Sequence, residues 1–390
     1  MYHIEIEKYI LTQYKAVYII SIYMLITRKN CVICDNILSQ LTELHNHVLS
    51  FSPTSTPCLT NETVSLPVGY CNHCYSLQFM KLIQPSILYK DSHNETFNTP
   101  TWKAHHSHFY DFFKDTLNGM NTCIEIGGAQ CILANKIIKE YPTLYYSILD
   151  IIEQPLTDID VQIGNCEEYV FFQDGVILSH VFEHLHHPRA FLKNINQSSI
   201  NYVILSVPNL EYLLEQNNLN LIHIEHTFYY NKTHLNYLFN QISFSCIKHE
   251  EFGNHSLFYI FKRDTTTIKD APNFICNEQL VKYYDNREIK LNKLIVTISN
   301  DIWIAPAGHY GHTIYSYLIQ KGYSNQIKAF IDNDRSKQGK FLNGTTIPIF
   351  PYSELCNQTN ITVILYAGIY SKEIASQILM LNDKVDLITL

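Results

Sequence analysis

The chain has 390 residues, 46% of them hydrophobic, and this length predicts two or three folded domains. Its formal net charge is −8 without a long basic run. This argues against a nucleic-acid partner, because binding phosphates requires clustered Lys and Arg. The 11 cysteines comprise two CxxC pairs and an odd, scattered remainder. That pattern is typical of a reducing cytoplasm rather than of a disulfide framework.

The first 30 residues are treated as an N-terminal extension. Ala16–Thr27 is an uncharged, mostly apolar run of 12 residues, too short to span a bilayer, so no membrane insertion is predicted. A small-residue cleavage site does not follow, and Arg28 lies on the wrong side for a signal peptide. The run is either a helix that packs on the body or a segment upstream of a true start at Met24, and the second interpretation is favoured.

The two CxxC pairs predict a zinc site. Cys31 and Cys34 form the first pair, Cys71 and Cys74 the second, and 36 residues lie between them. Four thiolates complete a tetrahedron around zinc and leave no open position, so the predicted role of the metal is structural. The alternative is four reduced cysteines without a metal.

Residues 31–85 are the predicted zinc-binding module. Ser52–Pro67 is rich in Ser, Thr and Pro, which predicts an irregular loop. A module of this size has little core of its own, so we expect the metal to supply much of its stability.

Residues 86–263 predict a doubly wound α/β domain. A helix is expected at Trp102–Leu117 and is ended by Asn118-Gly119. Five short apolar runs then predict parallel strands, at Thr122–Ile126, Leu144–Asp150, Val161–Gly164, Val176–Val181 and Tyr202–Val207. A last pair of runs, Ile242–His249 and Leu257–Lys262, is joined by Gly253-Asn254 and predicts an antiparallel hairpin. Ile132–Glu140 and Pro188–Asn196 are predicted connecting helices.

Residues 264–390 predict a second, smaller α/β unit. A helix is expected at Glu278–Leu294, followed by strands at Ile302–Ala305, Ile327–Ile331 and Ile361–Tyr366. Gly308 and Gly311 follow the first of these strands, which is a weak signal for a phosphate-binding turn.

Several polar or glycine residues follow the predicted strands of the middle domain. Glu125, Gly127 and Gly128 end the first strand, and Asp150 ends the second. The segment SHVFEHLHHPRAFLKNI, which begins with Ser179 and His180, follows the fourth. In a doubly wound sheet, ligands bind at the carboxyl ends of the strands, and an acid after the second strand accepts ribose hydroxyls.

These segments resemble class I S-adenosylmethionine (SAM)-dependent methyltransferases, in which a HVLEH sequence follows the fourth strand. The resemblance implies a seven-stranded doubly wound fold with SAM as cofactor. It implies that Glu125, Gly127 and Gly128 line the methionine end of SAM and that Asp150 holds the ribose. Cys166 and Glu167 would lie near the adenine, and Ser179 and His180 at the same edge of the sheet.

The order of the units resembles the nucleotide-sugar C-methyltransferase family, in which a zinc module precedes the methyltransferase core and a Rossmann-like unit follows it. Glu225-His226 and the aromatic residues after it resemble the segment that carries the family's catalytic base. Asp332, Lys337 and Gly339 resemble its C-terminal DxNxxKxG stretch. By resemblance, the C-terminal unit helps to bind a nucleotide sugar.

Two positions depart from the family pattern. Cys131 stands where a glycine is usual in the cofactor loop, and His223-Ile224 replaces Tyr-His before Glu225. Whether His223 takes over work of the absent tyrosine is left open. His184, His186 and His187 suggest a second metal, but their expected place between a strand end and a helix start favours ordinary polar roles.

The predicted reaction is methylation of the carbon next to the ketone of a nucleoside-diphosphate 4-keto sugar. His226 would remove a proton, because imidazole is a suitable general base near neutral pH, while Glu225 would orient the site or contact the substrate. One alternative is O- or N-methylation of a sugar in surface polysaccharide biosynthesis. The other is a non-catalytic binding protein that retains the fold.

Overall fold

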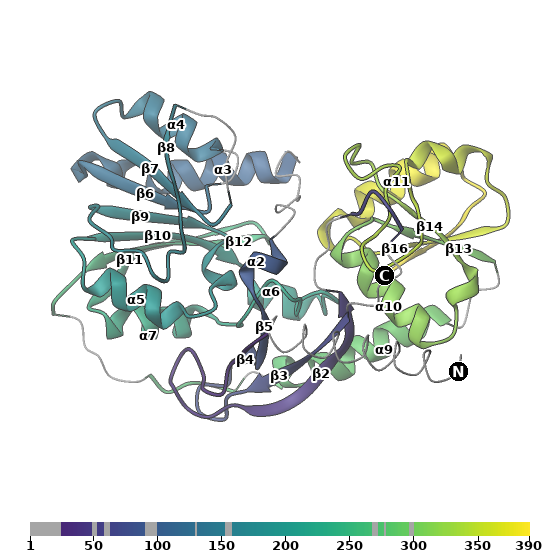
Figure 1. The fold of residues 1–390 in the computed structure, drawn as a ribbon, viewed down its shortest axis with the longest axis horizontal. Helices are drawn as coiled ribbons and strands as arrows, with labels where there is room; N and C mark the ends of the chain where they lie inside the picture. Colours follow the sequence, from purple (N-terminus) through teal and green to yellow (C-terminus); the bar gives the residue numbers. More distant parts are fainter. Residues whose placement is uncertain are drawn as a thin grey trace, which may run out of the picture.

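The computed structural model describes residues 25–48, 53–57, 63–89, 100–128, 131–152, 158–266, 272–276, 278–295 and 300–390. A large mixed sheet with helices on both faces occupies one lobe, and a smaller parallel sheet occupies the other (Figure 1). The strands of the N-terminal module lie below and between them. Met24, the alternative start, and Cys58 lie outside the described residues.

The large sheet has seven strands in the order β11-β12-β10-β9-β6-β7-β8. Only β12 runs antiparallel to its neighbours, β10 and β11. The strands are β6 Thr122–Ile126, β7 Tyr145–Asp150, β8 Asp160–Ile163, β9 Gly175–Ser179, β10 Tyr202–Pro208, β11 Phe244–Phe252 and β12 Ser256–Arg263. The predicted mixed α/β domain with a seven-stranded sheet is thus confirmed, and the chain order reverses between β6 and β9, where ligands bind in such sheets.

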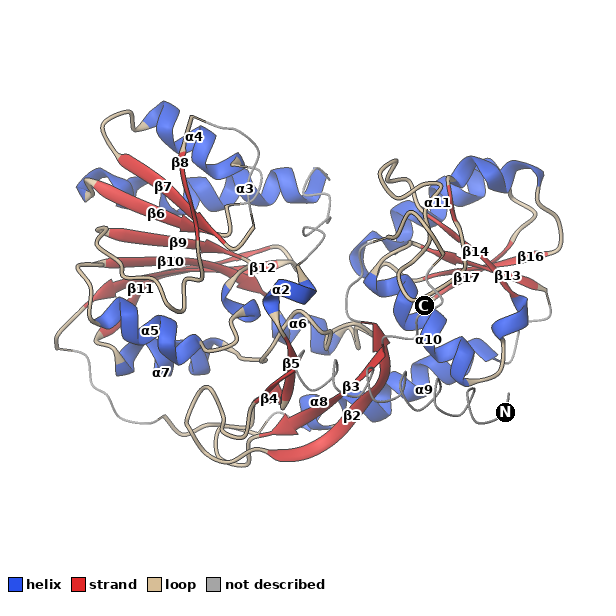
Figure 2. Cartoon of the chain, viewed as in Figure 1, coloured by secondary structure: helices blue, strands red, loops and turns tan. Residues whose placement is uncertain are grey.

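Helices cover both faces of this sheet (Figure 2). Side chains of α3 and α4 pack on one face with Ile148, Ile177 and Ile204, and those of α5 and α7 pack on the other. The helices of the domain are α3 Pro100–Phe113, η1 Lys114–Gly119, α4 Ile132–Glu140, η2 Phe182–His184, α5 Pro188–Asn196, α6 Leu210–Glu215 and α7 Lys232–Gln241. Both sheet faces are therefore buried, which explains why its strands are near-continuous apolar runs.

The N-terminal module is built from strands that the sequence did not predict. β2 Ser39–Val48, β3 Thr63–Tyr70 and β4 Leu77–Phe79 form an antiparallel sheet. β1 Leu25–Thr27 pairs with β5 Lys81–Ile83, and the short α2 Pro85–Leu88 follows. The prediction of an irregular loop over Ser52–Pro67 is wrong at its end, because β3 begins at Thr63. The buried apolar residues Val64, Leu66 and Val68 alternate along this strand, which pairs with β2.

This module does not rely on the four cysteines alone for its core. Val64, Leu66 and Val68 of β3 pack in one buried cluster with Leu221 and Tyr229 of the middle domain. The module is therefore completed by side chains from a distant part of the chain, which also contains His226.

The C-terminal unit contains a five-stranded parallel sheet in the order β15-β14-β13-β16-β17. Its strands are β13 Asp301–Ala305, β14 Ile327–Ile331, β15 Ile349–Phe350, β16 Ile361–Leu365 and β17 Asp386–Thr389. Its helices are α8 Glu278–Val281, α9 Tyr283–Ile295, α10 His309–Gln320, η3 Ser324–Gln326, η4 Tyr352–Asn357, η5 Gly368–Tyr370 and α11 Ser371–Leu381. The helix predicted at Glu278–Leu294 is thus two helices, α8 and α9.

Among the described residues, no helix combines the length and the apolar character that crossing a membrane requires.

Candidate functional site

The turn after β6 lies at the carboxyl edge of the large sheet, where the sequence predicts the cofactor. Gly127 has a φ of +69°, and a Cβ built on it would lie 2.7 Å from Cγ2 of Val181. Gly128 is also close-packed, since a Cβ there would lie 3.0 Å from Ile148 Cδ1. The first position needs glycine both for its left-handed backbone and for the close approach of the segment after β9.

Cys131 retains the backbone of the turn although it lacks the freedom of glycine. Its φ is 55°, in the left-handed region, and its amide donates to the Gly128 carbonyl at 2.7 Å. The side chain is buried among Leu133, Ile148 and other apolar residues between the sheet and α4. The sequence departure at this position therefore puts a strained residue in a turn of the left-handed type.

Glu125 and Asp150 end neighbouring strands. The hydroxyl of Tyr146 donates to Glu125 Oε2 at 2.9 Å. Burial, with a further contribution from Asp150, raises the pKa of Glu125 to about 7, and the Tyr146 hydrogen bond opposes this shift. Asp150 accepts a hydrogen bond from the Ile152 amide at 3.0 Å, which orients its carboxylate at the end of β7.

Cys166 and Glu167 follow β8, as predicted, and both are buried. Glu167 Oε1 accepts a hydrogen bond from the His187 amide at 2.6 Å, at the start of α5. This contact gives Glu167 a structural role in addition to any contact with a cofactor. Ser179 ends β9, and its hydroxyl is buried without a hydrogen-bond partner among the described residues.

The side chain of His180 joins a second group of imidazoles. His105 of α3, His180 and His255 each bring one possible ligand atom within 4.8 Å of the others, so they are a candidate metal group. The Ser256 hydroxyl lies 2.7 Å from His180 Nε2 and 2.6 Å from His255 Nδ1. The third ring, that of His105, has its Nε2 at 2.8 Å from the Ser206 hydroxyl, so one nitrogen of each ring lies within hydrogen-bond distance of a serine.

The predicted catalytic residues lie between the middle domain and the C-terminal unit. The centroid of the His226 ring lies 3.8 Å from the centroid of the His223 ring and 5.0 Å from that of the His184 ring. His309, at the start of α10, lies 5.5 Å from His223. Burial first, and then the neighbouring histidines, lower the pKa of His226 well below its ordinary value. His226 is therefore neutral at neutral pH.

Tyr89, Glu183 and His309 also belong to this cluster, although the sequence analysis predicted no role for them. The Tyr89 hydroxyl lies 2.9 Å from His184 Nδ1, so another tyrosine is present near the site whose expected tyrosine is replaced by His223. Burial, Glu225 and Glu183 raise the pKa of Tyr89 well above its ordinary value. The SHVFEH segment could have indicated Glu183 and His184 from the sequence. The approach of Tyr89 could not be predicted in this way, because it is a tertiary contact.

Glu183 is a buried carboxyl group beside the catalytic cluster. Its oxygens accept no hydrogen bond from the described residues, although His180 Nδ1 lies 3.3 Å from Oε1. Burial raises its pKa to about 7, against an opposing effect of His184. One of its oxygens, a ring nitrogen of His184 and one of His226 lie within 4.8 Å of one another. Glu183 is therefore a buried carboxyl group of raised pKa that lies close to the His184 and His226 rings.

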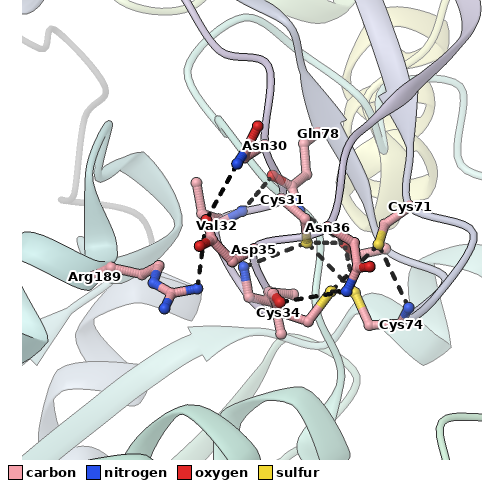
Figure 3. A network of polar contacts seen from close by, with 12 residues as sticks. Asn30, Cys31, Val32, Cys34, Asp35, Asn36, Cys71, Cys74, Gln78 and Arg189 are labelled. Carbon is pink, nitrogen blue, oxygen red and sulfur yellow. Dashed lines mark hydrogen bonds and ion pairs between the residues drawn. The ribbon is translucent and has the colours of Figure 1, made fainter.

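The four cysteines of the CxxC pairs converge as predicted (Figure 3). Sγ of Cys31 lies 3.5 Å from that of Cys74, and Sγ of Cys34 lies 3.4 Å from that of Cys71. Four sulfurs at the usual zinc–sulfur distance would be about 3.8 Å apart in a tetrahedron, so the group fits zinc. Gln78 Nε2 donates to Cys31 Sγ at 2.8 Å and orients this ligand.

Comparison with known proteins assigns the last unit. Residues 299–388 match the family model of the C-methyltransferase C-terminal domain. This unit is therefore similar to the C-terminal domain of C-methyltransferases. The middle domain has the seven-stranded order of a class I methyltransferase fold. Among curated proteins, no sequence matches the chain significantly.

The solved structures to which this chain is similar are remote. Human N-acetylserotonin methyltransferase in complex with SAM is 16% identical, with a TM-score of 0.36; the match covers 42% of this chain and 53% of that one. The chain thus spans about half the length of that enzyme. The PH0226 protein from Pyrococcus horikoshii OT3 is 14% identical, with a TM-score of 0.35, and 46% of this chain and 96% of that one are covered.

Proposed function

We propose that the chain is a SAM-dependent methyltransferase, which transfers a methyl group to the carbon next to the ketone of a nucleoside-diphosphate 4-keto sugar. The observation that carries the proposal is the position of His226. A neutral imidazole lies at the carboxyl edge of the methyltransferase sheet and is linked through His223 to His309 of the C-methyltransferase C-terminal domain. A base at that border is suited to a substrate that contacts both units.

The residues at the edge of the sheet fit SAM. The tight turn at Gly127 leaves backbone accessible to the methionine end, and Asp150 at the end of the next strand suits the ribose hydroxyls. The unpartnered hydroxyl of Ser179 adds a polar group at the same edge. When bound, the cofactor supplies an electrophilic methyl group. The burial of the Cys131 side chain among apolar residues on the α4 side of the sheet favours the enzyme over the binding-protein alternative.

His226 is proposed as the general base. Its lowered pKa keeps the ring neutral and ready to accept a proton from the carbon next to the carbonyl. The ring becomes a cation in a buried place, so a nearby acid must offset the charge. Glu183, which has a pKa of about 7, and the neighbouring Glu225 are placed for this role. The His184–Tyr89 hydrogen bond provides a donor for the developing enolate oxygen.

The C-terminal unit is proposed to hold the nucleotide sugar. Lys337 Nζ donates to the Ala307 carbonyl at 2.9 Å and to Asp332 Oδ2 at 3.2 Å, and Asp332 also accepts from the Ala307 amide. These contacts fix the turn that leads from β13 into α10. His309 begins that helix, so the same contacts set the distance between His309 and the catalytic histidines.

The expected setting is the cytoplasm, with zinc in a structural role. The cysteine cluster fits a closed four-sulfur site, so no step of the reaction is assigned to that metal.

Deuterium exchange tests the proposal. The enzyme is incubated in heavy water with S-adenosylhomocysteine and a panel of nucleoside-diphosphate 4-keto sugars, and the carbons next to the ketone are followed by NMR. Catalysed exchange at one carbon, lost in His226→Ala but retained in His108→Ala, is expected. His108 is a matched control because it is exposed on α3 and paired with Glu250. Methylation of a keto sugar by the same enzyme without such exchange would instead favour the O- or N-methylation alternative.

A further inference from the structure

The segment that follows His226 is part of the sheet contacts of the zinc module. The Phe79 amide donates to the Thr227 carbonyl at 3.1 Å, and the Tyr229 amide donates to the Leu77 carbonyl at 2.9 Å. Gln78 and Phe228 form the antiparallel bridge between these two hydrogen bonds. Strand β4 therefore fixes the backbone immediately after the proposed base.

Arg28 joins the same segment to the one that carries His184. Nη1 donates to the Thr227 carbonyl at 2.7 Å, and Nη2 donates to the His186 carbonyl, also at 2.7 Å. Arg28 is only 7% exposed. Burial lowers its pKa to about 10, so it is still charged at neutral pH. The planar guanidinium holds two acceptors at a fixed separation, which an ammonium group does not do.

Gln78 connects these contacts to the cysteine cluster. While its backbone bridges Phe228, its side chain donates to Cys31 Sγ at 2.8 Å and accepts from the Val32 amide at 3.0 Å. Gln78 is fully buried, so this orientation is fixed by packing as well as by hydrogen bonds. The position of the first CxxC turn is thereby transmitted to the backbone beside His226.

The other end of the catalytic segment is held by the C-terminal part of the chain. The Leu219 amide donates to the Tyr366 hydroxyl at 2.7 Å. The Leu219 carbonyl accepts from the Tyr283 hydroxyl at 2.7 Å and from Arg287 Nε at 3.0 Å. The segment from Leu219 to Tyr229 is therefore fastened on one side by the C-terminal unit and on the other by the zinc module.

We infer that Arg28 is a positioning residue, which sets the separation of His226 and His184 by holding the Thr227 and His186 carbonyls together. Arg28 and Gln78 of the zinc module thus act on the reaction by fixing the backbone beside the base. The effect on turnover rests on the proposed function, whereas the effect on backbone order does not.

Hydrogen–deuterium exchange of the full chain, read by mass spectrometry, tests this inference. In Arg28→Lys, which retains the charge and loses the fork, we expect amides in residues 223–230 to exchange roughly tenfold to a hundredfold faster. The zinc content and the affinity for S-adenosylhomocysteine should remain within twofold of wild type. Lys29→Ala is the matched control, because Lys29 is the next residue, is cationic and is exposed.

Unchanged exchange in residues 223–230 would overturn the inference. So would faster exchange spread equally over α3 and α4, since that reports a loss of overall stability. If Arg28→Lys does not fold, Gln78→Ala tests the same contacts from the side of the cysteines and should accelerate exchange in the same peptide. With a substrate at hand, kcat should fall at least tenfold while the KM for SAM is unchanged. Faster local exchange in an enzyme that labels no keto sugar would leave the inference standing and remove the proposed reaction.

Discussion

Replacing Gly127 by alanine should disturb both the stability of the methyltransferase domain and its cofactor site. The residue has a φ of +69°, where an alanine costs about 1–2 kcal/mol. The new Cβ would lie 2.7 Å from Val181 Cγ2, closer than packed carbons allow, so Val181 must move. Overpacking of this kind costs about 1–3 kcal/mol. Together these terms predict a destabilisation of about 2–5 kcal/mol.

Gly253→Ala is the matched control for the backbone term. Gly253 also has a positive φ, of +50°, but a Cβ there would meet nothing within 4 Å. Its variant should therefore lose only the backbone term. In denaturant unfolding, Gly127→Ala should lose at least about 1 kcal/mol more than Gly253→Ala, and Val181→Ala should recover that difference in the double variant.

Calorimetry with S-adenosylhomocysteine gives the second readout for this pair. The Gly127 variant should bind at least about tenfold more weakly, whereas the Gly253 variant should bind like wild type. The reasoning is refuted if the two variants are equally stable and bind the ligand equally well.

Three further predictions concern separate groups. Burial raises the pKa of Glu183 from its ordinary 4.5 to about 7, so the unfolded state loses this proton first and the free energy of unfolding falls as the pH rises from about 4.5 to 7. Glu183→Gln should remove up to about 3 kcal/mol of this pH dependence, measured by denaturant unfolding at pH 5 and pH 8. Elemental analysis should find one zinc ion per chain. Cys74→Ser should lower this zinc content and should also lower the free energy of unfolding by more than about 3 kcal/mol. His309→Ala should raise the pKa of His226, measured by NMR of the labelled ring, because a neighbouring histidine that lowers it is removed; an unchanged pKa would mean that His309 lies farther away in solution.

Local sequence patterns predicted the middle domain well. The predicted bounds of β6, α4 and α5 agree with the structure, because each is a strongly patterned segment bounded by a turn residue or by proline. The residues at the carboxyl ends of β6, β7 and β9 could be named in advance, since parallel strands bring their ends to one edge.

Contacts between units could not be predicted in this way. Nothing in the local sequence shows that Tyr89 reaches His184, or that Arg28 reaches Thr227, which is 199 positions away. The strands of the zinc module were missed for the same reason, because β3 is completed by packing against distant residues such as Tyr229. The division of the predicted helix into α8 and α9 also accompanies a contact between units. Tyr283, at the junction of the two helices, is buried, and its hydroxyl donates a hydrogen bond to the Leu219 carbonyl.

Titration of the zinc-loaded protein with S-adenosylhomocysteine by calorimetry tests the cofactor site most directly. Our account predicts micromolar binding at one site per chain, lost in Asp150→Ala, because Asp150 is the oriented carboxylate at the end of β7. Absence of binding by a well-folded sample would contradict it and would favour a binding protein that retains the fold.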